Sequence, residues 1–406
     1  MEFQAERIKL IKTSPSMAIS LQARKMRQEG TDVIDLSLGE PDFDTPVHIV
    51  EAAYCAMRAG QTRYTAADGT PELKAAVARK FQRDNGLVFA PDEISVANGA
   101  KQSIFNGLFA TLEPGDEVLI PAPFWVSYSD MVLLAGGVPR IVPCGIESDF
   151  LLTPESFEQH LTPRTRWVIL NSPSNPSGAV YDRERLGALG DVLLKHRRVL
   201  VLSDEIYEHI TYGAVPFVSF GAACPALRGR TLIVNGVSKT YAMTGWRIGY
   251  AAGPKALMVA MGKIQSQSTS NPCSVAQAAA VEALNGPQDC VAPMVAEYRS
   301  RSTRVIEALS RIPGLRTAQP QGAFYAYPHC GSFIGTRTPD GQTISNDTDL
   351  AAYLLRIGHV ATVPGVAFGL SPYLRLSFAT SQAILDDAME RIQRALADLQ
   401  PQDAQL

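Results

Sequence analysis

Three short apolar runs in the middle of the chain have the composition of buried strands: residues 167–170, 199–202 and 232–234. The loop after the first run contains Asn175, and the second run leads to Asp204, with Tyr207 close behind. The third run leads to Lys239. Each polar residue has an ordinary alternative role, as a turn former, a helix cap, a core tyrosine or a solvated lysine. Ligands of open α/β sheets bind outside the carboxyl ends of the strands. One shared binding site therefore explains these four residues better than four separate structural roles.

Lys239 is the candidate with the most specific chemistry. It is the only lysine between Lys195 and Lys255, and it lies among residues that would otherwise be buried. A desolvated lysine has a lowered pKa and can act as a neutral amine nucleophile, as Schiff-base chemistry requires.

The stretch around residues 94–101 is a candidate anion site. Residues 94–97 predict a strand, Gly99 follows it, and a helix with apolar residues at helical spacing begins near Lys101. A helix start at Gly99, Ala100 and Lys101 would offer free backbone N–H groups and the positive end of the helix dipole to a phosphate. The stretch matches neither GxGxxG nor GxxxxGK[ST], which argues against a dinucleotide site or a P-loop.

Pyridoxal 5'-phosphate is the one cofactor that fits this set of side chains. It needs a lysine for its Schiff base and an acid that keeps the pyridine nitrogen protonated, and Lys239 and Asp204 suit these tasks. Asn175 and Tyr207 could hydrogen-bond the phenolic oxygen of the ring. Arg247, whose guanidinium is always charged, could help to hold the phosphate.

Composition sets limits on the other classes of function. The 406 residues exceed one typical core, so we expect two domains. A net charge of −3 without a long basic run argues against nucleic acid or an anionic membrane as a partner. The N-terminus lacks the apolar core of a signal peptide, and no apolar stretch has transmembrane length. Six scattered cysteines without a CxxC pair are typical of reduced thiols, so we expect a cytoplasmic protein.

Eight stretches together resemble the class I/II pyridoxal-phosphate aminotransferases, in particular the bacterial aspartate/prephenate aminotransferase subgroup. They are GEPDFDTP, NGAKQ, PFWVSY, NSPSNPSGAVY, SDEIYEH, NGVSKTYAMTGWRIGY, QSQSTSNP and LRLSFATS. The resemblance runs from about Arg7 to the last helix and so covers nearly the whole chain.

The resemblance implies an α/β protein of pyridoxal-phosphate fold type I. A large domain, residues 46–285, would carry a mostly parallel seven-stranded sheet between helices. A small α/β domain would join residues 1–45 to residues 286–406. The implied reaction moves the amino group of aspartate to 2-oxoglutarate or another 2-oxo acid, and glutamate and the prephenate–arogenate pair are further implied substrates. The alternative is an aminotransferase of another amino acid, such as alanine or an aromatic amino acid, or a β-lyase on the same fold.

The resemblance also implies roles for single residues. Lys239 is the expected Schiff-base lysine, and Asp204 is the expected partner of the pyridinium. The other expected cofactor contacts are Gly99, Ala100, Lys101, Trp125, Asn175, Tyr207, Ser238, Arg247 and, reaching across a homodimer with shared active sites, Tyr64. Expected contacts of the substrate are Gly39, Trp125, Asn175 and Arg375. The segment IQSQSTSNP contains no arginine or lysine for a distal carboxylate, which leaves Lys12 and Lys101 as candidates.

Overall fold

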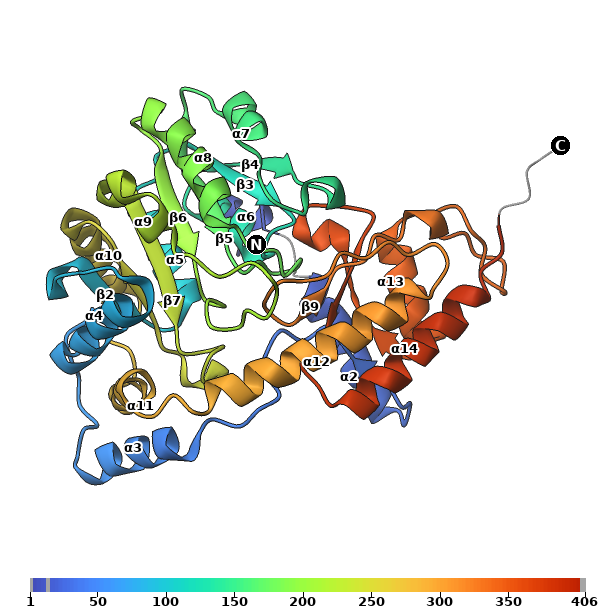
Figure 1. The fold of residues 1–406 in the computed structure, drawn as a ribbon, viewed down its shortest axis with the longest axis horizontal. Helices are drawn as coiled ribbons and strands as arrows, with labels where there is room; N and C mark the ends of the chain where they lie inside the picture. The colour runs from blue at the N-terminus through green and yellow to red at the C-terminus, as the bar shows by residue number, and fades with distance from the viewer. Residues whose placement is uncertain (1–2, 12–14, 402–406) are drawn as a thin grey trace.

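The computed structural model describes residues 3–11 and 15–401. Its main feature is a seven-stranded sheet with the order β2-β8-β7-β6-β5-β3-β4 (Figure 1). The strands are β2 (Ile94–Ala97), β3 (Glu117–Ala122), β4 (Val138–Pro143), β5 (Thr165–Asn171), β6 (Leu200–Asp204), β7 (Thr231–Gly236) and β8 (Gly249–Ala252). Only β8 runs antiparallel to its neighbours. The expected mostly parallel sheet is therefore confirmed.

The central strands are apolar along their length because helices cover both faces of the sheet. Leu232 and Val234 of β7 pack on one face, and Ile233 packs on the other. The first face is covered by α5 (Ala100–Phe109), α6 (Ser127–Leu134) and α10 (Lys255–Ser268). The second is covered by α4 (Pro71–Asn85), α7 (Pro154–His160), α8 (Arg183–Lys195), α9 (Phe220–Ala223) and α11 (Ser274–Asn285). The helix α3 (Val47–Arg58) packs on α11.

A second lobe contains two smaller sheets. In one, β11 (Val363–Pro364), β12 (Leu374–Ser377) and β9 (Tyr325–Ala326) are antiparallel, and in the other β1 (Ile34–Asp35) pairs parallel with β10 (Val360–Ala361). The helices of this lobe are α2 (Pro15–Gln28), α13 (Asp347–Arg356) and α14 (Gln382–Ala397). Figure 1 shows α12 (Val291–Ser310) running from the large lobe to this one. The short α1 (Glu6–Lys9) lies against α6.

Within the described ranges, no helix is both long and apolar enough to span a membrane.

Candidate active site

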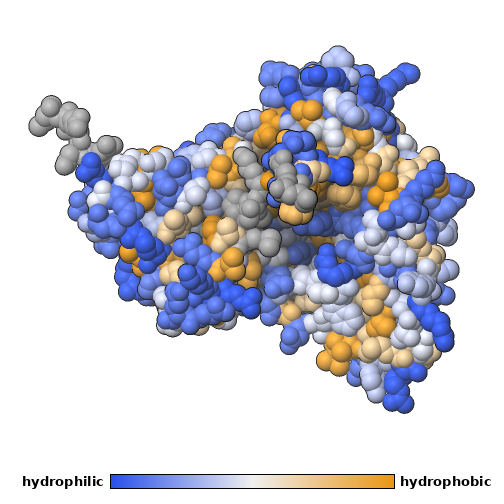
Figure 2. Space-filling model, turned by 180° about the vertical axis from the view of Figure 1, so that it is seen from behind, coloured by the Kyte–Doolittle hydropathy of each residue, from blue (hydrophilic) through white to orange (hydrophobic). Residues whose placement is uncertain are grey.

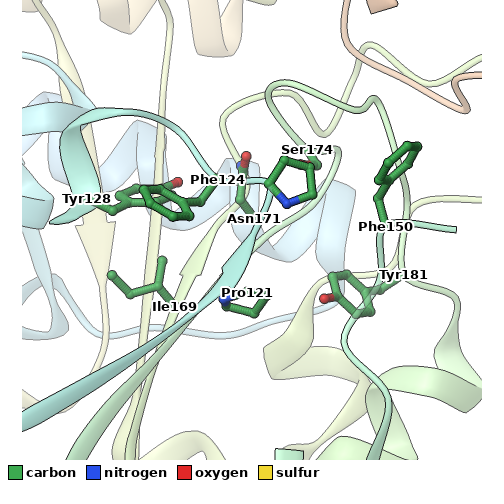
Figure 3. A pocket seen from close by; sticks show the side chains of 9 residues that line it. Pro121, Phe124, Tyr128, Phe150, Ile169, Asn171, Ser174 and Tyr181 are labelled. Atoms are coloured by element: carbon green, nitrogen blue, oxygen red, sulfur yellow. The ribbon is translucent and has the colours of Figure 1, made fainter. Parts of the chain in front are cut away.

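A cavity of about 920 Å³ lies outside the carboxyl ends of the central strands and extends to the second lobe. Its lining includes the four strand-end side chains singled out in the sequence: Asn175, Asp204, Tyr207 and Lys239. A separate cavity of only about 20 Å³ lies between Tyr128, Asn171 and Tyr181 (Figure 3). That volume suits about one water molecule, so the larger cavity is the candidate for a substrate site.

The Lys239 amine lies inside the large cavity. Its Nζ donates to the Gly39 carbonyl oxygen at 2.6 Å and lies 5.7 Å from the ring centres of Tyr207 and Phe324. Burial lowers the pKa of Lys239 to about 8, because the charged form loses solvation, while Glu40 opposes this shift. A substantial fraction of this amine is therefore neutral near physiological pH.

Asp204 is a buried carboxylate at the end of β6. Its Oδ2 accepts from the Tyr128 hydroxyl at 2.6 Å, and its Oδ1 accepts from the Ile206 N–H at 3.2 Å. Burial raises the pKa of Asp204 to about 6, although both hydrogen bonds stabilise the charged form. Among the residues that the structure describes, no basic side chain forms an ion pair with it. The carboxylate is thus able to accept a cationic N–H from a ligand.

Arg375 on β12 is a buried cation, with only 4% of its surface exposed. Its Nη1 donates to Asn175 Oδ1 at 3.1 Å and its Nη2 donates to the Ser37 carbonyl oxygen at 2.6 Å. Its Nε is buried without a hydrogen-bond partner in the described part of the chain, and no described carboxylate pairs with the guanidinium. A buried charge without a counter-ion is costly, so this site favours an anionic ligand.

Two neutral phenols lie beside Arg375. The hydroxyl groups of Tyr207 and Tyr325 are 2.8 Å apart, and the guanidinium carbon of Arg375 lies 4.7 Å from the Tyr325 ring centre. Burial raises the pKa of both tyrosines. Both therefore remain hydrogen-bond donors across the physiological pH range.

The start of α5 forms a third part of the site. Gly99 has a φ of +87°, and a Cβ there would lie 2.4 Å from Nη2 of Arg247, so this position needs glycine. Arg247 Nη2 donates to the Asn98 carbonyl oxygen at 3.2 Å, which places the guanidinium beside the helix start. Gly249 allows the same approach from β8, since a Cβ there would lie 2.1 Å from the Ala100 nitrogen. The backbone N–H groups and Arg247 together make a positive corner of the cavity.

Lys101 and Trp125 meet at the rim of this corner. Lys101 Nζ lies 4.8 Å from the Trp125 ring centre, a cation–π distance. Burial, followed by the nearby Arg247 charge, lowers the pKa of Lys101. Ser238 lines the same cavity.

Tyr64, a predicted contact of the cofactor, is not brought to this cavity within its own chain, because it is 90% exposed and does not line it. Lys12 lies outside the described residues. Gly39, by contrast, borders the site closely, because a Cβ there would lie 2.7 Å from the Tyr325 hydroxyl.

Sequence reasoning missed several side chains of the site. Tyr128 holds Asp204, and Tyr325 contacts both Tyr207 and Arg375. Arg24 of α2 also lines the cavity. One local feature of the sequence could have indicated Tyr128. It follows Trp125 by three residues at the start of a helix, which places both side chains near the same site.

Comparison with known proteins identifies the family. The family model described as Aminotransferase class I and II matches residues 31–392. The chain belongs to this family. The family uses pyridoxal phosphate, and the chain is an aminotransferase.

Individual relatives of this aminotransferase cover almost the whole chain. An aspartate aminotransferase of Rhizobium meliloti is 54% identical over 391 residues, which are 96% of this chain and 95% of that protein. An aspartate/prephenate aminotransferase of Cereibacter sphaeroides is 51% identical over 399 residues, or 98% of this chain and 100% of the relative. The crystal structure of an aspartate aminotransferase from Rhizobium meliloti has a TM-score of 0.96 at 52% identity and covers 98% of this chain and 100% of the other. The fold is therefore pyridoxal-phosphate fold type I, as expected.

Proposed function

We propose that this aminotransferase takes the amino group of aspartate and transfers it to 2-oxoglutarate or another 2-oxo acid, with prephenate as a further acceptor. The observation that carries the proposal is Arg375, a buried cation without a carboxylate partner among the described residues, in the same cavity as Lys239 and Asp204. Such a guanidinium fits the α-carboxylate that all amino acids and 2-oxo acids share. The names of the relatives support aspartate as the donor.

The residues present fit pyridoxal 5'-phosphate. Lys239 offers an amine of lowered pKa, and Asp204 offers a buried carboxylate that lacks a basic partner in the described chain. The helix start at Gly99, Ala100 and Lys101, with Arg247 and Ser238, offers donors for a phosphate, while Trp125 offers a ring face for stacking. When bound, the cofactor supplies an electron sink for the α-carbon of the amino acid.

The side chains of the cavity then orient the substrate and move one proton. Arg375 binds the α-carboxylate, with Asn175 and the backbone at Gly39 beside it, and so fixes the α-carbon. Lys239 would take the α-proton with its neutral amine and later give it back, as a base and acid whose pKa of about 8 lies near the working pH. Tyr207 and Asn175 would hydrogen-bond the phenolic oxygen of the bound cofactor. The hydrogen bonds from Tyr128 and Ile206 stabilise the charged form of Asp204 and oppose the rise in its pKa that burial causes.

A distal carboxylate needs a second cation. Lys101 lines the cavity and lies over Trp125, on the rim where a substrate side chain would extend. We propose Lys101, together with Lys12, as the groups that select a dicarboxylic donor. The segment IQSQSTSNP offers no positive charge for this role.

We further propose a homodimer in which Tyr64 of one subunit reaches the cofactor phosphate of the other. In support, Tyr64 is 90% exposed and lies outside the cavity of its own chain. Large hydrophobic residues are also exposed along α3: Val47, Val50, Tyr54 and Met57. Figure 2 shows exposed hydrophobic residues in several patches of the surface. The division into a domain of residues 46–285 and one of residues 1–45 with 286–406, and a cytoplasmic location, belong to the same proposal.

A panel of amino donors tests the assignment. Aspartate, glutamate, alanine and phenylalanine are each incubated with 2-oxoglutarate, or with oxaloacetate for glutamate, at saturating pyridoxal phosphate. Aspartate is expected to give the highest kcat/KM, with glutamate and oxaloacetate as products. A donor with a β-leaving group, such as cystathionine, is added for the alternative, and release of a thiol, pyruvate and ammonia from it without glutamate would instead establish a β-lyase. Lys239→Ala is expected to lose steady-state turnover, and wild-type turnover in that variant would refute the role of Lys239.

A further inference from the structure

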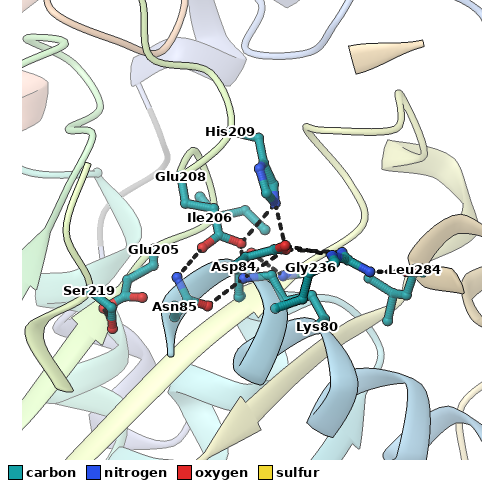
Figure 4. A network of polar contacts seen from close by, with 12 residues as sticks. Lys80, Asp84, Asn85, Glu205, Ile206, Glu208, His209, Ser219, Gly236 and Leu284 are labelled. Carbon is teal, nitrogen blue, oxygen red and sulfur yellow. Dashed lines mark hydrogen bonds and ion pairs between the residues drawn. The ribbon is translucent and has the colours of Figure 1, made fainter. Parts of the chain in front are cut away.

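A second cluster of charged residues lies behind the cavity, between α4 and the segment that follows β6. Lys80, Asp84 and Asn85 come from α4, and Glu208 and His209 come from the segment (Figure 4). We call these five residues the buried anchor. None of them lines the substrate cavity.

Lys80 and Glu208 form the centre of the buried anchor. Only 1% of Lys80 and 4% of Glu208 is exposed, and the ammonium group contacts Glu208 Oε1 directly. Asn85 joins the two, because its Oδ1 accepts from Lys80 Nζ at 2.8 Å and its Nδ2 donates to Glu208 Oε2 at 2.9 Å. An ion pair this deeply buried must be held in a fixed geometry to offset the loss of solvation.

His209 and Asp84 close the buried anchor on its outer side. His209 Nε2 lies 3.2 Å from Glu208 Oε1 and 3.3 Å from Asp84 Oδ2. Burial disfavours the charged imidazole, but the two carboxylates outweigh it and raise the pKa of His209 to about 9. Arg83 adds a further charge, since its Nε donates to Asp84 Oδ1 at 2.6 Å. Asp84, Glu208 and His209 lie close enough together to hold a metal ion, but the Lys80 ammonium and the charged imidazole already supply positive charge to the two carboxylates.

The buried anchor is joined to the active site through the main chain. Glu208 directly follows Tyr207, and only three residues lie between Asp204 and Glu208. The segment forms a turn without regular helix, held within itself by the bonds from Glu208 N to Glu205 O at 3.0 Å and from Ile210 N to Tyr207 O at 2.8 Å. Main-chain bonds hold both ends of the segment, since Glu205 N donates to Val234 O of β7 and Ala323 N donates to Ile210 O, each at 2.9 Å. Tyr207 and Glu208 lie between these points, so the contacts of their side chains set their position.

Neighbouring side chains of this segment point to opposite sides. Tyr207 faces the cavity, where its hydroxyl meets that of Tyr325, while Glu208 faces α4 and Lys80. A displacement of Glu208 would therefore displace Tyr207.

We propose that the pair of Lys80 and Glu208 positions Tyr207 for its hydrogen bond to the ligand in the cavity. The inference rests on the proposed role of Tyr207 as a donor to the cofactor. Lys80 and Glu208 are positioning residues and touch neither the substrate nor the reacting atoms. They act by fixing the turn between Asp204 and Ile210 against α4.

The test uses the double variant Lys80→Met/Glu208→Gln, which removes both charges at similar volume and leaves no buried charge of this pair behind. Its readouts are the free energy of unfolding in urea, the pH midpoint of the visible absorption of the bound cofactor, and kcat and KM. Tyr207→Phe is measured alone and combined with the double variant. Glu208→Gln is the second variant, because Lys80 then keeps Asn85 and Asp84 as partners.

The expected result is a folded double variant whose absorption midpoint moves in the same direction as in Tyr207→Phe, by about 0.4–1.1 pH units. Its kcat/KM is expected to fall about two- to tenfold. In the Tyr207→Phe background the double variant is expected to cause markedly less further shift, because the hydrogen bond is already absent. The matched control is Glu117→Gln, which removes another buried carboxylate, one that pairs with Arg164, and is expected to lower stability without moving the midpoint.

Two results would overturn the inference. One is a wild-type absorption midpoint in the folded double variant or in Glu208→Gln. The other is a midpoint shift of the double variant that adds in full to the shift of Tyr207→Phe. An unchanged midpoint in Tyr207→Phe alone is a different failure, because it refutes the role proposed for Tyr207 itself.

Discussion

Replacing Arg375 with lysine separates the proposed α-carboxylate site from the rest of the cavity. The guanidinium is 4% exposed and donates to two neutral acceptors, Asn175 Oδ1 and the Ser37 carbonyl oxygen. Lysine keeps the positive charge but replaces a planar fork of parallel N–H donors with a single ammonium group. The substitution therefore tests the geometry of the donor rather than its charge.

The size of the expected loss follows from the number of hydrogen bonds. A hydrogen bond to a charged group contributes roughly 1.5–3 kcal/mol, so the loss of one of two bonds to the carboxylate lowers kcat/KM about 10- to 150-fold. Aspartate, glutamate and alanine all carry the α-carboxylate, so Arg375→Lys is expected to affect them equally. An amine that lacks this group, such as ethylamine, is expected to react at the wild-type rate.

The assay is a single-turnover reaction of the cofactor-loaded enzyme with each donor, followed by stopped-flow absorbance. Arg391→Lys serves as the control. Arg391 of α14 pairs with Asp387 of the same helix and with Asp32, and it does not line the cavity. A loss of kcat/KM confined to aspartate would show that Arg375 binds the distal carboxylate instead. An equal loss with ethylamine would show that the substitution damages the site in general, and either result refutes the reasoning.

Three further predictions concern selectivity, pH dependence and assembly. Lys101→Met is expected to lower kcat/KM for aspartate at least about tenfold and to leave alanine nearly unchanged, and equal losses for both donors would contradict the selectivity role. In the cofactor-free protein burial raises the pKa of Asp204 from its ordinary value of 3.8 to about 6, so the stabilising contribution of this group is complete below about pH 3.8 and is lost as pH rises through 6. Asp204→Asn should remove this pH dependence and raise the free energy of unfolding at pH 7 to 8 by roughly 1–3 kcal/mol, although it weakens cofactor binding. Urea unfolding of the cofactor-free wild type and variant from pH 4 to 8 checks this. An unchanged pH profile in the variant would contradict it. Mixed dimers of Lys239→Ala and Tyr64→Ala chains are expected to regain activity that neither variant has alone, and verified mixed dimers without activity would exclude shared sites.

Three central strands of the sheet and the side chains at their ends could be predicted from the sequence. The runs that became β5, β6 and β7 were legible because strands buried on both faces are continuously apolar and are bounded by turn residues. Parallel strands end at one edge of a sheet, so Asp204 and Lys239 had to lie near each other once the sheet was inferred. The helix start at Gly99 was also local, since a strand, a glycine and a helix follow one another directly.

The ends of a strand depend on its pairing partner. Residues 33–38 have the composition of a strand, but only Ile34–Asp35 form β1, because β1 pairs with β10 over just two residues. The residues after it turn toward the cavity, where the Ser37 and Gly39 carbonyl groups accept from Arg375 and Lys239.

The partners of the functional groups follow only from the packing of segments that are distant in the sequence. Tyr128 meets Asp204 across 76 positions, and Arg375 meets Ser37 across 338. Neither contact leaves a periodic pattern, because periodicity reports which face of an element is buried and not what that face meets. The pairing of Lys80 with Glu208 also leaves no pattern in the sequence, where one is a lysine in a charged helix and the other a glutamate after a tyrosine. They become partners because both are buried between α4 and the turn after β6. Long-range packing sets the solvation of each group, and solvation sets the pKa values of Lys239 and Asp204 on which the proposed chemistry depends.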